Sequence, residues 1–141
     1  FDGYRPWAGE IRARHTGSLV SDRTGQITPF AMIQLADRGQ LFVEPGQETY
    51  EGQVVGINPR AEDLDINVTR EKKLTNMRSS TADVIETLAR PLELDLEQAM
   101  EFCAADECVE VTPEIVRVRK VELTASLRAR AKARAKQQAN S

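Results

Sequence analysis

The stretch Gln53-Val54-Val55-Gly56-Ile57-Asn58, followed by Leu64-Asp65-Ile66-Asn67-Val68, decides the fold class of this 141-residue chain. The first stretch is the clearest strand of the sequence. In the second, apolar and polar residues alternate, which is typical of a strand with one buried face. A polar turn at residues 59–63 separates the two, so this part of the chain is predicted to be β.

The N-terminal side of this region predicts further short elements. Residues 18–21 are a short apolar-centred strand, and Thr24-Gly25 is a turn signal before residues 26–30, so a hairpin is expected there. Residues 31–39 predict a short helix that ends at Gly39. Residues 40–43 predict another strand.

The C-terminal side predicts helices and a second hairpin. Residues 94–105 predict an amphipathic helix with Asp95 as its cap and Gln98 three residues later. Strands are expected at residues 108–111 and 115–121, around a turn at 112–114. The apolar surface of these two predicted elements comes from Leu96, Ala99, Met100, Cys103, Val116, Val118 and Val121.

Many short strands with inserted helices predict a mainly β, α+β fold. We expect a small OB-like β-barrel with a helical insert and a basic C-terminal helix or tail. Periodicity leaves a β-sandwich open as the alternative.

Charge is distributed very unevenly along the chain. The net charge is −3, but residues 93–114 hold eight acids and no base, whereas residues 117–136 hold eight bases and one acid. No window approaches the roughly 20 apolar residues of a membrane span, and no basic-then-apolar signal opens the chain. Because it starts at Phe1, we expect it to be part of a longer protein.

Catalytic chemistry has few candidates here. The chain has one histidine, His15, which we expect at the surface, and it lacks a glycine-rich phosphate loop and a nucleophile elbow. Asp63 and Asp65 would share one face of a strand and could act as a carboxylate pair, or they could be turn and surface residues. Cys103 and Cys108 are too few for a disulfide framework or a four-ligand zinc site, so we expect free, at least partly buried thiols. A binding module is favoured over a small enzyme that uses the two aspartates.

Residues 70–80 break the strand pattern. They contain four basic residues and one acid, together with hydroxyl and amide side chains. Lys and Arg bind phosphates, while Asn, Ser and Thr reach base edges or the ribose hydroxyl. The composition indicates a nucleic-acid-binding loop, with a solvated loop as the alternative.

The last predicted helix, residues 125–138, follows a possible cap at Thr124. It has no apolar stripe, so it would be only marginally stable alone. Its cations recur at every second position, which spreads positive charge around the helix and argues against a membrane-surface helix. A tail that adds affinity for RNA and one that only aids solubility both remain open. The cations are Arg128, Arg130, Lys132, Arg134 and Lys136.

Several motifs stand in a recognisable order. The most specific is Lys72-Lys73-Leu74-Thr75-Asn76-Met77-Arg78-Ser79-Ser80, and others are Asp37-Arg38-Gly39-Gln40-Leu41-Phe42-Val43-Glu44-Pro45-Gly46 and Glu107-Cys108-Val109-Glu110-Val111-Thr112-Pro113. Together they resemble the TypA/BipA family of translational GTPases over roughly residues 3–121. At Thr81-Ala82-Asp83 the chain departs from the Gly-Lys-Asp-like stretch common in the family. Further matching segments are 17–21, 50–56, 60–67, 96–99 and 117–120.

The resemblance implies a domain organisation. Residues 1–8 would end an elongation-factor-like domain V, residues 9–123 would form the family's C-terminal OB-like domain, and residues 124–141 would be a basic tail. GTP and Mg²⁺ would bind in an N-terminal domain that this chain lacks, so we expect no catalysis and no cofactor within residues 1–141.

The resemblance also implies partners. The complete protein would be a cytoplasmic monomer that binds the ribosome and acts in ribosome assembly and stress-adapted translation. The 70–80 segment would contact 23S rRNA and A-site tRNA. The alternative is a protein-interaction domain whose acidic 93–114 face binds a basic ribosomal protein. The implied RNA-contacting residues are Arg70, Lys72, Lys73, Asn76, Arg78, Ser79 and Ser80.

Overall fold

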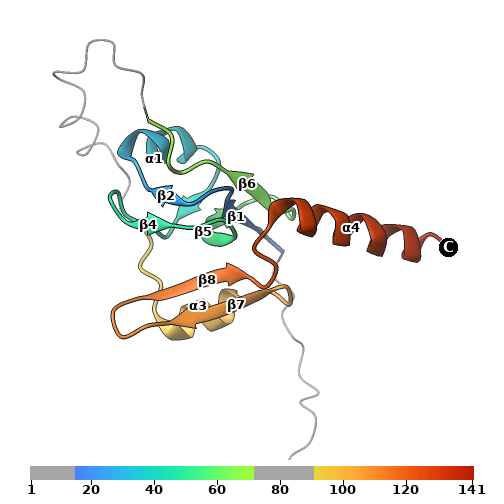
Figure 1. Ribbon diagram of the computed structural model, residues 1–141. Helices are drawn as coiled ribbons and strands as arrows, with labels where there is room; N and C mark the ends of the chain where they lie inside the picture. The colour runs from blue at the N-terminus through green and yellow to red at the C-terminus, as the bar shows by residue number, and fades with distance from the viewer. Residues whose placement is uncertain (1–14, 72–90) are drawn as a thin grey trace, which may run out of the picture.

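The computed structural model describes residues 15–71 and 91–141 of the chain. Within these ranges the fold mixes helices and strands, with a six-stranded sheet at its centre (Figure 1). The elements are β1 (Gly17–Ser21), β2 (Gly25–Gln26), α1 (Pro29–Leu35), β3 (Gln40–Leu41), β4 (Glu48–Thr49), β5 (Gln53–Asn58), β6 (Leu64–Ile66), α3 (Leu96–Phe102), β7 (Glu107–Val111), β8 (Val116–Lys120) and α4 (Ala125–Ala139).

Strand β5 organises the large sheet. The strand order is β6-β1-β5-β8-β7, and β3 also pairs with β5. Along one edge of β5, Gln53 and Val54 pair with β8, whereas Gly56 and Ile57 pair with β3. The pairing of β1 with β6 is parallel, and the other pairs are antiparallel. One strand therefore joins the N-terminal and C-terminal parts of the fold.

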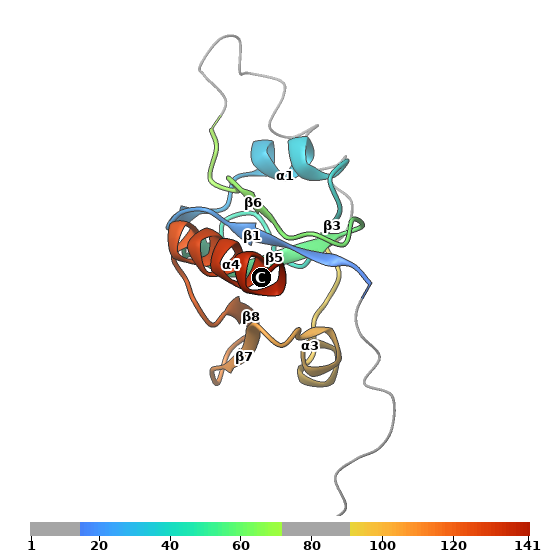
Figure 2. The same ribbon diagram turned by 90° about the vertical axis from the view of Figure 1, so that its right-hand side faces the viewer.

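The sheet carries a hydrophobic core on each face. The pairing register of β1 shifts between Leu19 and Val20, and these two neighbours belong to different hydrophobic clusters. Helix α1 covers the first core and α3 covers the second, on opposite sides of the sheet (Figures 1 and 2). The first core contains Leu19, Ile27, Met32, Leu41, Val43, Val55, Ile66 and Val68, and the second contains Val20, Val54, Ala99 and Val118.

Local sequence signals explain where the two short helices begin. The Thr28 hydroxyl accepts a hydrogen bond from Ala31 N at 3.2 Å, with Pro29 in the first helical turn of α1. At α3, Asp95 and Gln98 form a reciprocal capping box, as the sequence predicted. Each arrangement satisfies backbone N–H groups that a helix start leaves unpaired.

Several sequence predictions are confirmed. Strand β5 has the predicted bounds, and the predicted helices near residues 31–39, 94–105 and 125–138 and the β7–β8 hairpin are all present. His15 is exposed and both cysteines are half-buried.

Three expectations differ from the structure. The hairpin across Thr24-Gly25 is absent, because β2 pairs with β4 instead of β1. In α3 only Ala99 is buried, while Leu96 and Met100 are 44% and 64% exposed. The described strands form no closed barrel: β6 and β7 are the ends of the sheet, and the short β2, β3 and β4 cannot supply the continuous pairing that closure requires.

Candidate functional site

The structure describes only one of the residues that the resemblance implies for RNA contact. Arg70 is exposed at the end of a turn that follows β6. The other six predicted contacts remain predictions because they lie outside the described residues: Lys72, Lys73, Asn76, Arg78, Ser79 and Ser80.

The chain on both sides of residues 72–90 is held firmly. Before it, the Thr28 hydroxyl donates to the carbonyl oxygen of Arg70 at 2.5 Å, and Thr28 N donates to Val68 O at 3.1 Å. After it, Leu92 N donates to Leu41 O at 3.0 Å. Val68 belongs to the first core, whereas Leu94 packs against the second. The predicted RNA-binding segment therefore connects elements that pack into different cores.

Helix α4 is a second feature with nucleic-acid-binding chemistry. Its start is fixed by a hydrogen bond from Ala125 N to Glu51 Oε1 at 3.0 Å and by an ion pair between Arg128 and Asp65. None of its residues is buried, and it extends away from the sheet (Figures 1 and 2). At 100° per residue, Arg130 and Arg134 lie on the side opposite Arg128. These two have no ion-pair partner among the described residues, so they are free to bind an anion.

A buried ammonium group lies between the two halves of the fold. The Lys120 side chain is 1% exposed, and its Nζ donates to Asp63 at 2.5 Å, Asp106 at 2.9 Å and Glu107 at 3.0 Å. Burial lowers the pKa of Lys120, but hydrogen bonds to the three carboxylates more than offset this, so its pKa is raised. The carboxylate oxygens lie within 4.8 Å of one another, a spacing suited to a cation, and the ammonium fills that role.

Asp63 and Asp65 do not form a carboxylate pair. Asp63 also accepts a hydrogen bond from Ser18 N at 2.9 Å, and Asp65 is bound to Arg128. Both aspartates thus stabilise contacts between distant parts of the chain, and the hypothesis of an enzyme built on them loses its basis.

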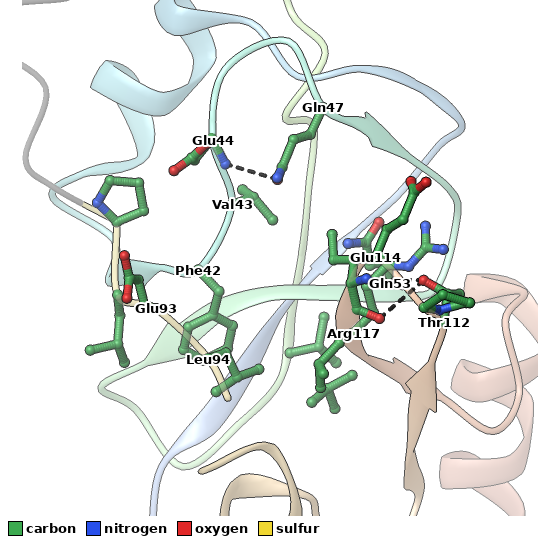
Figure 3. Close-up of a pocket in the computed structure, with 17 residues that line it drawn as sticks. Phe42, Val43, Glu44, Gln47, Gln53, Glu93, Leu94, Thr112, Glu114 and Arg117 are labelled. Carbon is green, nitrogen blue, oxygen red and sulfur yellow. Dashed lines mark hydrogen bonds between the residues drawn. The ribbon is translucent and has the colours of Figure 1, made fainter. Parts of the chain in front are cut away.

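A pocket of about 520 Å³ lies beside β5 and β8 and is also lined by residues 91–94. Its lining includes residues 42–44, 91–94 and 112–118 (Figure 3). Two buried polar atoms on its wall, Gln53 Oε1 and Arg117 Nε, have no hydrogen-bond partner among the described residues. Unsatisfied buried polar atoms are uncommon in proteins, so the pocket has the features of a binding site.

Comparison with known proteins identifies the family. A family model described as the TypA/BipA C-terminal domain matches residues 16–125. The chain belongs to the TypA/BipA C-terminal domain family.

The chain is also similar to curated relatives named "Large ribosomal subunit assembly factor BipA". It is 47% identical over 131 residues to the protein of Salmonella typhimurium, which covers 93% of this chain and 21% of that protein. It is 42% identical over 118 residues to the Synechocystis protein, covering 84% of this chain and 20% of that protein. The chain therefore spans about a fifth of the length of these relatives.

Sequence reasoning missed Lys120 and the pocket. In β8, Val116 and Val118 predicted one inward face, but Val121 was assigned to the apolar surface and is 62% exposed. The next position of the two-residue period is Lys120, which is buried. The signal for a buried Lys120 was that the inward-facing alternation of β8 continues onto a lysine, in a chain with many acids that could pair with it. The pocket had none, because it is assembled from segments far apart in the sequence.

Proposed function

We propose that this TypA/BipA C-terminal domain is a ribosome-contacting module of a larger protein that assists assembly of the large ribosomal subunit. The observation that carries this proposal is the similarity, over 93% of the chain, to proteins named large ribosomal subunit assembly factors. The larger protein would act in the cytoplasm, including in stress-adapted translation. It would hydrolyse GTP with Mg²⁺ in a part absent from these 141 residues.

The proposed ligand of the module is RNA. The 70–80 segment would contact 23S rRNA and A-site tRNA, with Lys72, Lys73 and Arg78 on phosphates and Asn76 on base or ribose groups. Support comes from its cationic composition and from the family resemblance of its motif. Arg130 and Arg134 of α4, which have no ion-pair partner within residues 15–71 and 91–141, would add affinity that does not depend on base sequence.

The proposal is tested by binding of the chain to purified large subunits over a series of salt concentrations. The variant Lys72→Ala/Lys73→Ala/Arg78→Ala should bind more weakly, and the slope of log affinity against log salt should fall by about 2 to 3 if each cation contacts a phosphate.

The matched control removes three exposed cations elsewhere, by Arg23→Ala/Arg38→Ala/Arg60→Ala. It changes the net charge equally and should leave most of the affinity. Equal binding by the loop variant and the unmodified chain would show that the segment does not contact RNA.

A second candidate function is binding of a basic ribosomal protein. A group of exposed glutamates favours it. None of them has an ion-pair partner in the described part of the chain: Glu93, Glu97, Glu101 and Glu114. Two of these glutamates, Glu93 and Glu114, line the pocket beside β5 and β8.

A further inference from the structure

The pocket beside β5 and β8 adjoins a second hollow at the β7–β8 turn. This hollow of about 580 Å³ shares most of its lining with the pocket, including Gln47, Thr112 and Arg117, and adds Glu48. We call the two hollows together the β8 groove.

The wall of the β8 groove contains one buried acceptor and one buried donor that have no hydrogen-bond partner among the described residues. Gln53 is only 4% exposed, and its Oε1 accepts no hydrogen bond from the described residues. Arg117 stacks over the Tyr50 ring at 5.7 Å, and its Nε lies 3.7 Å from Glu110, too far for a hydrogen bond. A peptide backbone offers the complementary groups, since each residue carries an N–H donor and a C=O acceptor.

The rim of the β8 groove is acidic. Figure 3 shows Glu44 and Glu93 on one side and Glu114 on the other, with Gln53 and Arg117 near Glu114. Glu48 lines the second hollow. These four glutamates are exposed, and none is paired with a cation in the described ranges. Four negative charges against the single Arg117 disfavour phosphate and favour Lys or Arg side chains.

The floor of the β8 groove is apolar. Phe42 and Phe102 meet edge to face with ring centroids 5.2 Å apart, and Phe42, Leu94 and Val116 reach the pocket from this cluster. All three are half-buried, so each offers a surface for an apolar side chain of a ligand.

We propose that the β8 groove binds an extended, lysine- or arginine-rich peptide segment of a partner protein. Its backbone hydrogen bonds with Gln53 and Arg117, its cations lie against the glutamate rim, and an intervening apolar side chain packs on Phe42 and Leu94. The proposal deepens the second candidate function and rests on it for the partner being a ribosomal protein. The binding chemistry itself does not depend on RNA contact by residues 70–80.

The test uses a fluorescein-labelled peptide in which lysine alternates with valine, measured by fluorescence anisotropy. The rim variant Glu44→Gln/Glu93→Gln/Glu114→Gln should weaken binding by about tenfold, as expected from losing three exposed ion pairs. The matched control Asp37→Asn/Glu62→Gln/Glu122→Gln removes three exposed acids outside both the groove and the 93–114 face and should change affinity less than about twofold. Equal losses of peptide affinity in the two variants would show that binding depends only on the overall negative charge, and this would overturn the proposal.

Gln53→Leu separates binding from folding. Replacing an amide whose buried oxygen accepts no hydrogen bond from the described residues by an apolar side chain of similar size should leave stability nearly unchanged, yet peptide affinity should fall. In NMR spectra, the Arg117 Nε–H resonance should also shift when the unmodified chain binds the peptide. Unchanged affinity in Gln53→Leu with no shift at Arg117 would place the peptide elsewhere.

Two further experiments distinguish a peptide ligand from an RNA ligand. A labelled oligouridine should not compete with the peptide for the groove, and competition that the rim variant abolishes would indicate RNA in place of peptide. The Lys72→Ala/Lys73→Ala/Arg78→Ala variant should keep its peptide affinity. Loss of subunit binding in that variant with intact peptide binding would separate the RNA proposal from this one.

Discussion

Replacing Lys120 by methionine should destabilise the chain strongly, and the structure indicates which carboxylate causes the loss. Methionine keeps most of the side-chain volume. Asp63 and Asp106 are 38% and 64% exposed, so water can solvate them once the ammonium is gone. The Glu107 side chain is fully buried and would lose its ion pair with the ammonium, while its bonds from Ser18 Oγ at 2.5 Å and Ala104 N at 3.2 Å would remain. Removing one partner of a buried ion pair predicts a loss of about 3–5 kcal/mol.

Denaturant unfolding followed by far-ultraviolet circular dichroism measures this loss. Lys132→Met removes an exposed cation, 73% accessible, and should change the free energy of unfolding by less than about 0.5 kcal/mol. The double variant Lys120→Met/Glu107→Gln should recover at least half of the loss, because the buried charge is removed together with its partner. A loss below about 1 kcal/mol in Lys120→Met, or no recovery in the double variant, would refute this account.

The pH dependence follows from the raised pKa of Lys120. A lysine whose pKa is higher in the folded state stabilises fully below its unfolded value of 10.5, and the contribution disappears as pH rises through the folded value. The stability difference between the unmodified chain and Lys120→Met should therefore be constant from about pH 7 to about pH 9 and shrink only above 10.5. A difference that changes steadily across neutral pH would contradict the assignment.

Three further substitutions have defined outcomes. Gly52→Ala should lose about 1–3 kcal/mol of unfolding free energy, because Gly52 has φ +94° and a Cβ there would lie 2.7 Å from the backbone leading into α4. Gly46 has a similar φ of +88° but open space around it, so Gly46→Ala should lose less in the same denaturation assay. Asp95→Ala removes the capping box of α3 and should lose about 1 kcal/mol by the same measurement. Arg130→Glu/Arg134→Glu should weaken binding to large subunits at low salt while leaving the thermal midpoint unchanged; unchanged binding would assign α4 a role other than RNA contact.

Elements with a strong local signal were predictable from sequence. Strand β5 is rich in valine and isoleucine, and α3 carries a capping box, so local chemistry alone specifies both. The pairing of β2 with β4 was not predictable, because two-residue strands hold too little pattern to select a partner.

Some residues of the candidate site were likewise predictable from sequence, and others were not. The cations of residues 70–80 and of α4 are visible in the sequence, since charge needs no tertiary context to be recognised. Gln53 is unremarkable as a sequence letter at the start of β5, and its importance comes from being buried without a partner. Burial of Lys120 likewise depends on carboxylates 13 to 57 residues away in the chain.

The anchoring on either side of residues 72–90 has a consequence for how this domain can change over time. Arg70 and Leu92 are each secured to the folded body by hydrogen bonds that do not involve the intervening segment. Because doubling the number of residues between two fixed points of a chain generally costs only about 0.6 kcal/mol of closure entropy, the folded part of the domain should tolerate substitutions and length changes between these anchors. The segment can therefore diversify to match a changing binding surface while selection for foldability acts on the rest of the chain.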